Sequence, residues 1–146
     1  MSSKTLFISS LLFTLFTQTV SAETMEFKNL TGSWNLRVLD GKEVRKARAI
    51  LEFNGQQMKI SGFDGCNSIG GLLTQDPKTK NYSTKLRTTR MASRSSLHSY
   101  VSQKMHQTLE AKFIIKKEKK YGIKGITIKS AKHELFFKKM GKDSFF

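Results

Sequence analysis

Short segments of alternating apolar and polar residues, separated by pairs of turn-forming residues, most constrain how this chain can fold. Ser33–Leu39 carries apolar side chains at Trp34, Leu36 and Val38, which is typical of a strand with one buried face. Asp40–Gly41 and Asn54–Gly55 are pairs that favour tight hairpin turns, because both residues tolerate a positive φ. The pattern therefore predicts antiparallel strands joined by short connections.

About eight strands and one helix are expected. The further strands are predicted at 47–53, 57–63, 69–74, 82–86, 111–115, 121–128 and 132–137. Ser95–Glu110 instead places its apolar residues at steps of three or four, which predicts an amphipathic helix with Ser95 or Ser96 as its N-cap. The predicted fold class is mainly β (α+β): a single curled antiparallel sheet or small barrel whose helix covers one opening or face.

The first 22 residues have the layout of a secretory signal peptide. Lys4 provides a positive charge, Leu6–Phe16 is an apolar stretch, and Val20–Ala22 places small residues where a signal peptidase cleaves. An N-terminal membrane anchor is the alternative, although the stretch is shorter than the roughly 20 residues that span a bilayer. We expect cleavage after residue 22 and a single mature domain over 23–146, with its core at about 30–138. The product would be periplasmic or secreted, with no transmembrane span left after cleavage.

The chain is strongly basic, with a formal net charge of +15 from 26 Lys and Arg and 11 Asp and Glu. Charge of this size indicates the kind of partner rather than the fold. Behind a signal peptide it favours an envelope protein, a cell-wall polymer or an anionic lipid over nucleic acid. The candidate anionic-partner surface comprises Arg87, Arg90, Arg94, Lys116, Lys117, Lys119, Lys120, Lys138 and Lys139. Plain solubility, or lysines that protect edge strands, would explain the same residues without a partner.

A glycine-rich run, Gly62–Asn67, holds the only cysteine of the chain. The glycines indicate a sharp bend, and Asp64 and Asn67 are residues that stabilise turns through their own backbone. Cys66 has no second cysteine to pair with in this chain, and a buried thiol in the bend is favoured over a nucleophile. The histidines stand in no recognisable catalytic or metal-binding pattern, so neither a metal nor a cofactor is expected.

The run Ser61–Asn67 and the later segment Thr89–Ala92, which precedes the predicted helix, together resemble the two motifs of the META or HslJ-like domain family. The resemblance covers about residues 30–138. The matching motif residues, interpreted as structural, are Gly62, Phe63, Asp64, Gly65, Cys66, Asn67, Thr89, Arg90 and Met91. The family's second motif often ends in cysteine, whereas this chain has Ser93 there, so a disulfide between the motifs cannot form. The resemblance implies a bacterial envelope module linked to stress or virulence, without an established enzymatic activity.

The sequence therefore predicts a non-enzymatic binding module that uses a basic surface. The alternative is a carrier for a small apolar ligand or lipid, held in a barrel-like pocket. The aromatic residues expected on the inner faces, which would line that pocket or simply fill the core, are Trp34, Phe53, Phe63, Phe113, Phe136 and Phe137. An enzyme that uses Cys66 or Asp64 is the third hypothesis, and it lacks a visible nucleophile, base and orienting group together.

Overall fold

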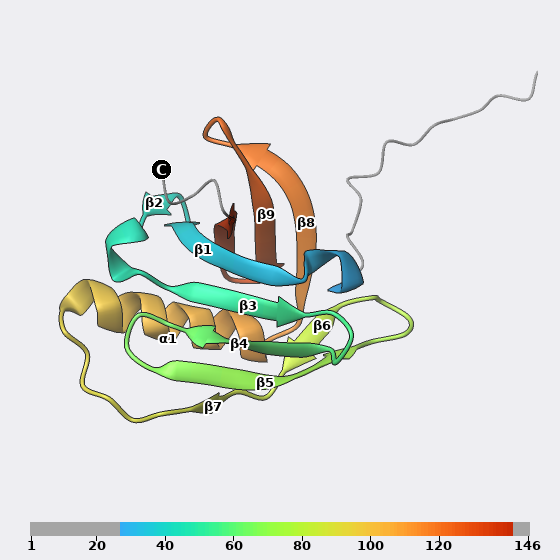
Figure 1. Cartoon of the computed structure of the whole chain (residues 1–146), viewed down its shortest axis with the longest axis horizontal. Coiled ribbons are helices and arrows are strands. Elements are labelled where there is room, and N and C mark those ends of the chain that lie inside the picture. Colours follow the sequence, from blue (N-terminus) through green and yellow to red (C-terminus); the bar gives the residue numbers. More distant parts are fainter. Residues whose placement is uncertain (1–26, 142–146) are drawn as a thin grey trace, which may run out of the picture.

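The computed structural model describes residues 27–141, and its strands form one antiparallel sheet that closes into a ring (Figure 1). The order around the sheet is β10-β9-β8-β6-β5-β4-β3-β1-β2, and β10 also pairs with β1. The strands are β1 (Gly32–Leu39), β2 (Lys42–Glu43), β3 (Ile50–Asn54), β4 (Lys59–Phe63), β5 (Ser68–Gln75), β6 (Tyr82–Thr84), β7 (Arg87–Thr88), β8 (Phe113–Lys120), β9 (Ile123–Ser130) and β10 (Glu134–Met140). The predicted mainly β, curled antiparallel architecture is confirmed. The predicted signal peptide and its cleavage site lie outside the described residues.

One α-helix, α1 (Ser96–Glu110), packs against β6 and β9, and two short 3-10 turns, η1 (Phe27–Leu30) and η2 (Arg45–Ala47), complete the described part of the chain. The hydroxyl of Ser95 accepts a hydrogen bond from the backbone N–H of His98, which satisfies one of the free amides at the start of the helix. Val101, Met105 and Leu109 are fully buried, so the predicted apolar stripe is the face that joins the core. None of the helices in residues 27–141 is long and apolar enough to cross a membrane.

The core corrects the prediction for two aromatic residues. Four of the six expected on inner faces belong to the core cluster, but Phe63 is only partly buried and Phe136 is buried outside that cluster. Successive strand residues face opposite sides of a sheet, so Phe136 and Phe137 cannot both point inward. The same alternation turns Phe63 away from the side that Ile60 occupies. Sequence alone could not decide which of these residues face the interior.

The two predicted hairpin turns differ in outcome. Asp40 and Gly41 have φ values of 48° and 81° and join the paired residues Leu39 and Lys42, as predicted. At Asn54–Gly55 the predicted hairpin forms between β3 and β4, but its turn is longer than the predicted two-residue type, because Asn54 still pairs with Lys59 and the connection consists of residues 55–58. Gly55 is needed for a different reason: a Cβ there would lie 2.6 Å from the Cα of Lys28.

Several element ends also differ from the prediction. The strand predicted from residue 47 begins at Ile50, because η2 occupies Arg45–Ala47. The strand predicted to end at Ile115 continues to Lys120. Its second half is lysine-rich and lacks an apolar alternation, and the residue pairs with β9 keep it extended. This lysine-rich half of β8 and the facing part of β9 form the hairpin at the top of Figure 1.

Candidate functional site

The glycine-rich motif forms a bend at the end of β4 whose glycines are fixed by the backbone. Gly62 has a φ of 149°, and a Cβ there would lie 2.0 Å from the carbonyl oxygen of Ile50 on the neighbouring strand β3. Gly65 follows with a φ of 103°, a conformation that side chains rarely allow. These two positions therefore need glycine for steric reasons, independent of any chemistry.

Asp64 lies inside this bend and is completely buried. One carboxylate oxygen accepts hydrogen bonds from the backbone N–H groups of Cys66 and Asn67, at 2.8 and 2.7 Å. The other accepts from the hydroxyl of Ser102 and from Nε2 of His106, both at 2.8 Å. Four donors satisfy a buried carboxylate, which would otherwise be costly to remove from water. Asp64 thereby ties the bend to helix α1.

Asn67 connects the two sequence motifs. Its side-chain oxygen accepts a hydrogen bond from the backbone N–H of Met91 at 2.6 Å and from the hydroxyl of Thr89 at 3.3 Å. The Thr89 hydroxyl in turn accepts from the backbone N–H of Ser68 at 3.1 Å. The segment before α1 is thus held to the bend by side chains that the motifs themselves supply.

The thiol of Cys66 is buried and contacts the hydroxyl of Ser93. Ser93 is the residue that stands where the resemblance led us to expect a cysteine. We call the whole arrangement, formed by Asp64, Cys66, Asn67, Ser93, Ser102 and His106, the motif clasp. Sequence reasoning identified its first half but missed Ser102 and His106, although their spacing of four residues places them on one helix face.

The three histidines take part in three separate interactions. His98 interacts with the N-cap Ser95, His106 belongs to the motif clasp, and His133 bonds Asp40 through Nδ1 at 2.7 Å. Within residues 27–141, no three His, Cys, Asp or Glu side chains gather in a way that could hold a metal ion.

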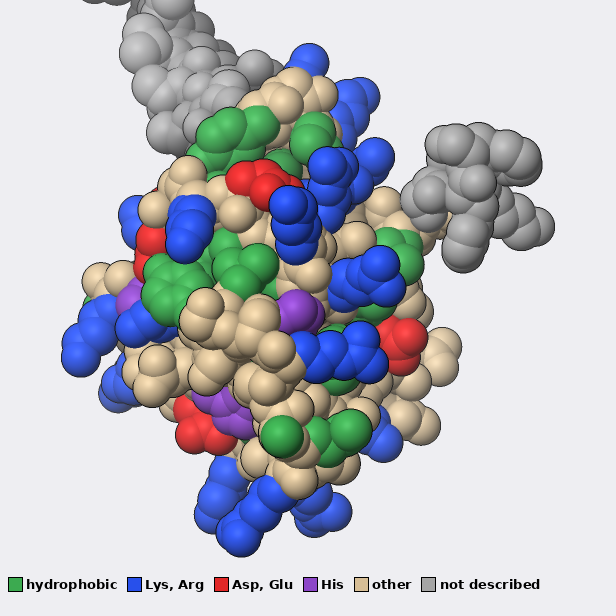
Figure 2. Space-filling model, turned by 90° about the vertical axis from the view of Figure 1, so that its left-hand side faces the viewer, with side chains coloured by type: hydrophobic (Ala, Val, Ile, Leu, Met, Phe, Trp, Pro, Cys, Tyr) green, Lys and Arg blue, Asp and Glu red, His purple; other side chains and the backbone are tan. Residues whose placement is uncertain are grey.

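The basic residues predicted to form one surface fall into two groups at opposite ends of the molecule. The lysines lie on β8 and β10, which flank β9, whereas Arg87 lies on β7, and Arg90 and Arg94 lie between β7 and α1 at the bottom of Figure 1. Figure 2 shows Lys and Arg side chains gathered at both the top and the bottom. The structure therefore does not bring the arginines and the lysines together.

Within the lysine group, Lys120 differs from the rest because two neighbouring carboxylates offset its positive charge. Its Nζ contacts the carboxylate of Glu134 and lies 3.7 Å from that of Glu118. The hydrogen bond to Glu134 raises the pKa of Lys120, and the same bond lowers the pKa of Glu134. The lysines on strands β8, β9 and β10 without an ion pair among the described residues are Lys116, Lys117, Lys119, Lys124, Lys129, Lys138 and Lys139.

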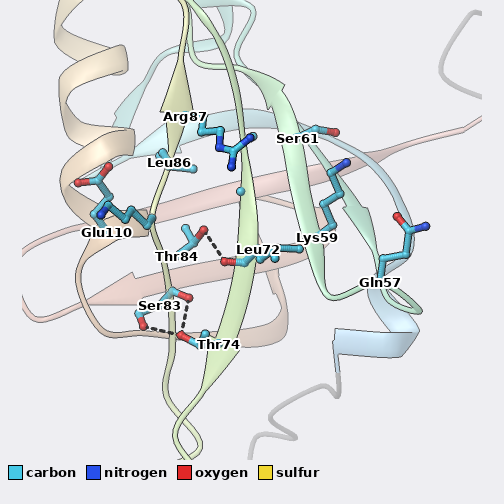
Figure 3. A pocket seen from close by; sticks show the side chains of 13 residues that line it. Gln57, Lys59, Ser61, Leu72, Thr74, Ser83, Thr84, Leu86, Arg87 and Glu110 are labelled. Carbon is cyan, nitrogen blue, oxygen red and sulfur yellow. Dashed lines mark hydrogen bonds between the residues drawn. The ribbon is translucent and has the colours of Figure 1, made fainter.

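An open groove that sequence reasoning missed runs over the outer face of β4, β5 and β6 (Figure 3). Gly70 lies between its cross-strand partners Ser61 and Arg87, and the missing side chain leaves the depression. Leu72 projects into it with 66% of its surface exposed, and Lys59 lies directly opposite Leu72. The Gly70–Gly71 pair within a strand was the signal that could have indicated this hollow.

Comparison with known proteins agrees with this geometry. The META domain family model matches residues 28–141. No curated protein matches the chain. The fold is similar to that of a solved structure described as the NMR structure of the protein from Burkholderia xenovorans, with 18% sequence identity and a TM-score of 0.60, covering 82% of this chain and 90% of that chain. At that identity the likeness concerns the fold alone. Because the family model spans both motifs and the closed sheet that carries them, the chain belongs to the META domain family.

Proposed function

We propose that this protein is a non-enzymatic, exported binding module of the bacterial envelope, periplasmic or secreted, which engages an anionic partner through its lysine-rich surface. The observation that carries the proposal is the imbalance of charge at the β8–β9 hairpin. Residues 116–124 contain five lysines, and Glu118 is the only acidic residue among them. Charges left without internal partners are available to an external one, and they accelerate association with an oppositely charged partner.

The motif clasp supports the non-enzymatic part of the proposal. Asp64 is fully buried and accepts four hydrogen bonds from the protein, so its carboxylate is already committed to the fold. The thiol of Cys66 faces Ser93 rather than a histidine. A nucleophile would need a base within hydrogen-bond reach and access to a substrate. The most conspicuous polar residues of the motif thus hold the two motifs and α1 together.

The alternative of a ligand carrier receives no support from the interior. The core aromatic side chains pack on one another, with ring centroids 5.2 Å apart for Phe27 and Phe53 and 6.0 Å apart for Tyr82 and Phe113. Trp34 donates its indole N–H to the carbonyl of Leu30 at 2.9 Å. In a small barrel, side chains packed in this way occupy the space that a ligand would need.

The proposal is tested by binding the protein to immobilised anionic polymers and to anionic vesicles over a range of salt concentrations. We expect saturable binding to at least one of them that weakens steeply as salt rises, because exposed charges are screened. The variant Lys117→Glu/Lys119→Glu/Lys124→Glu should lose that binding while it keeps its unfolding midpoint. Equally weak binding of the wild type and the variant at low salt would refute the proposal.

A further inference from the structure

The β8–β9 hairpin ends in an aromatic residue at a position that does not suit one. Lys120 and Ile123 are the last residue pair, so Tyr121 and Gly122 form a two-residue turn, with φ values of 54° and 74°. Turns of this kind favour Asn, Asp or Gly at both positions, because other side chains are strained at positive φ. A strained residue that persists at an exposed tip indicates a role other than folding.

The side chain of Tyr121 is also presented outward. It is 63% exposed, and its ring rests with an edge-on contact against Phe136, with the two centroids 6.0 Å apart. This contact supports the ring from one side and leaves the rest free. Among the residues that the structure describes, only two other large apolar side chains are comparably exposed, Leu72 and Met91, and both lie far from this hairpin in the sequence.

The lysines beside the turn add a second unfavourable feature. Lys119 and Lys124 are directly opposite each other across the two strands, and both are exposed. Like charges in that position repel. Protection of exposed strand edges could account for lysines here. Lys119 and Lys124 also lie where the hairpin extends beyond β10, because the pairing of β9 with β10 ends at Gly125.

We propose that this hairpin tip docks on an anionic lipid bilayer, with Tyr121 at the level of the lipid headgroups and Lys119 and Lys124 against their phosphates. The inference rests on the proposed function and narrows its partner to a membrane surface. Tyrosine has an apolar ring and a polar hydroxyl and is enriched at membrane–water interfaces. Nearby lysines are attracted by anionic headgroups.

The shape of the tip favours a membrane over an acidic peptide. A bound peptide would need pockets for its side chains or a groove along its length. The groove of Figure 3 lies on β4, β5 and β6, away from the tip of the hairpin. A projecting aromatic residue with lysines on both sides is suited to the flat, negatively charged surface of an anionic bilayer.

The test measures partitioning of the protein, in the form that the cell produces, onto phosphatidylcholine vesicles with and without phosphatidylglycerol. Lys119→Ala/Lys124→Ala should weaken partitioning onto anionic vesicles roughly 25-fold, at about fivefold for each lysine. Lys59→Ala/Lys85→Ala removes the same charge from the groove and should change it by less than about threefold, since only the long-range field is altered. Tyr121→Asn should weaken partitioning by about fivefold, because the variant loses the free energy gained when a small apolar area leaves water. Leu72→Asn, at a similarly exposed site, should leave it unchanged.

The possible results distinguish docking of the tip on lipid from binding of anionic partners in general. If Tyr121→Asn binds anionic vesicles as well as the wild type, the proposal that the tip docks on the bilayer is wrong. The proposed function still stands in that case if binding depends on salt and requires the lysines. If the wild type binds poly-glutamate but not anionic vesicles, the lipid assignment is overturned and an acidic polymer replaces it. If no anionic probe binds in a salt-dependent manner, both proposals fail. Because Asn suits the turn, the unfolding midpoint of Tyr121→Asn should stay close to that of the wild type, so a loss of binding is not a loss of fold.

Discussion

The motif clasp and the β8–β9 hairpin tip differ in where their charged groups find partners. Asp64 in the clasp is fully buried and accepts four hydrogen bonds, so every strong interaction it can make is made inside the protein. Lys119 and Lys124 at the tip are exposed and have no ion pair among the described residues. The motif that identifies the family therefore maintains the fold, whereas the charges that can serve a partner lie in a stretch without any motif.

The clasp is tested most severely by removing its carboxylate. Asp64→Ala leaves Ser102, His106 and two backbone N–H groups without their acceptor, and each buried unpaired donor costs about 1–3 kcal/mol. We expect the free energy of unfolding, measured by urea titration, to fall by at least about 3 kcal/mol. Asp64→Asn keeps the shape and one acceptor oxygen and should lose less. A loss below about 1 kcal/mol for Asp64→Ala would show that the clasp does not hold the fold together.

The contact between Cys66 and Ser93 predicts that a second cysteine would close the clasp covalently. Ser93→Cys should form a disulfide under oxidising conditions and raise the free energy of unfolding by roughly 2–4 kcal/mol, since the bond restricts the unfolded chain. A reducing agent should abolish the gain. The control Ser93→Cys/Cys66→Ala should show no such dependence on redox conditions. Free thiols in the oxidised single variant would contradict the close approach of the two motifs.

The ion pair beside the hairpin gives the smallest effect and connects stability with binding. The hydrogen bond from Lys120 lowers the pKa of Glu134 in the folded protein, so the pair adds stability above the unfolded pKa of Glu134, and this contribution is lost as the pH falls through the lower folded pKa. Because 41% of the Glu134 side chain is exposed, solvent screening keeps the contribution below about 1 kcal/mol.

Glu134→Gln should therefore lower the free energy of unfolding slightly at neutral pH, and the difference from the wild type should disappear in acid. The same variant leaves Lys120 with Glu118 as its only acidic neighbour, so binding to anionic vesicles should become up to about fivefold stronger. Unfolding and vesicle titrations on one preparation measure both effects. Weaker vesicle binding would argue against a role for the lysines at this end.

The sequence predicted the fold class because the inward residues of most strands alternate and the hairpin pair Asp40–Gly41 has only one comfortable conformation. At Asn54–Gly55 the same reasoning predicted the hairpin but not its longer turn, and the close approach of Lys28 in η1 explains why residue 55 is glycine. It also failed for the second half of β8, because residues 116–120 are all charged and carry no apolar signal. Phe136 shows the remaining difficulty: one strand presents two consecutive phenylalanines, and only tertiary packing decides which one enters the core.

For the candidate sites, the motif residues were predictable but their connections were not. The bond from His106 to Asp64 joins residues 42 positions apart, and no local pattern indicates it. The candidate basic surface combined six lysines, which lie on β8 and β10, with three arginines at the opposite end of the molecule. Tyr121 was not singled out, because a tyrosine in a lysine-rich stretch becomes informative only when its positive φ and its exposure are known.

Fluorescence quenching can show whether the hairpin tip is the surface that meets the membrane. Tyr121→Trp places a reporter at the tip, and the buried Trp34 provides the same background in every variant. On anionic vesicles that contain brominated lipids, we expect strong quenching of Tyr121→Trp beyond the wild-type level and no added quenching of Leu72→Trp. Equal quenching of the two variants, or none in either, would contradict it.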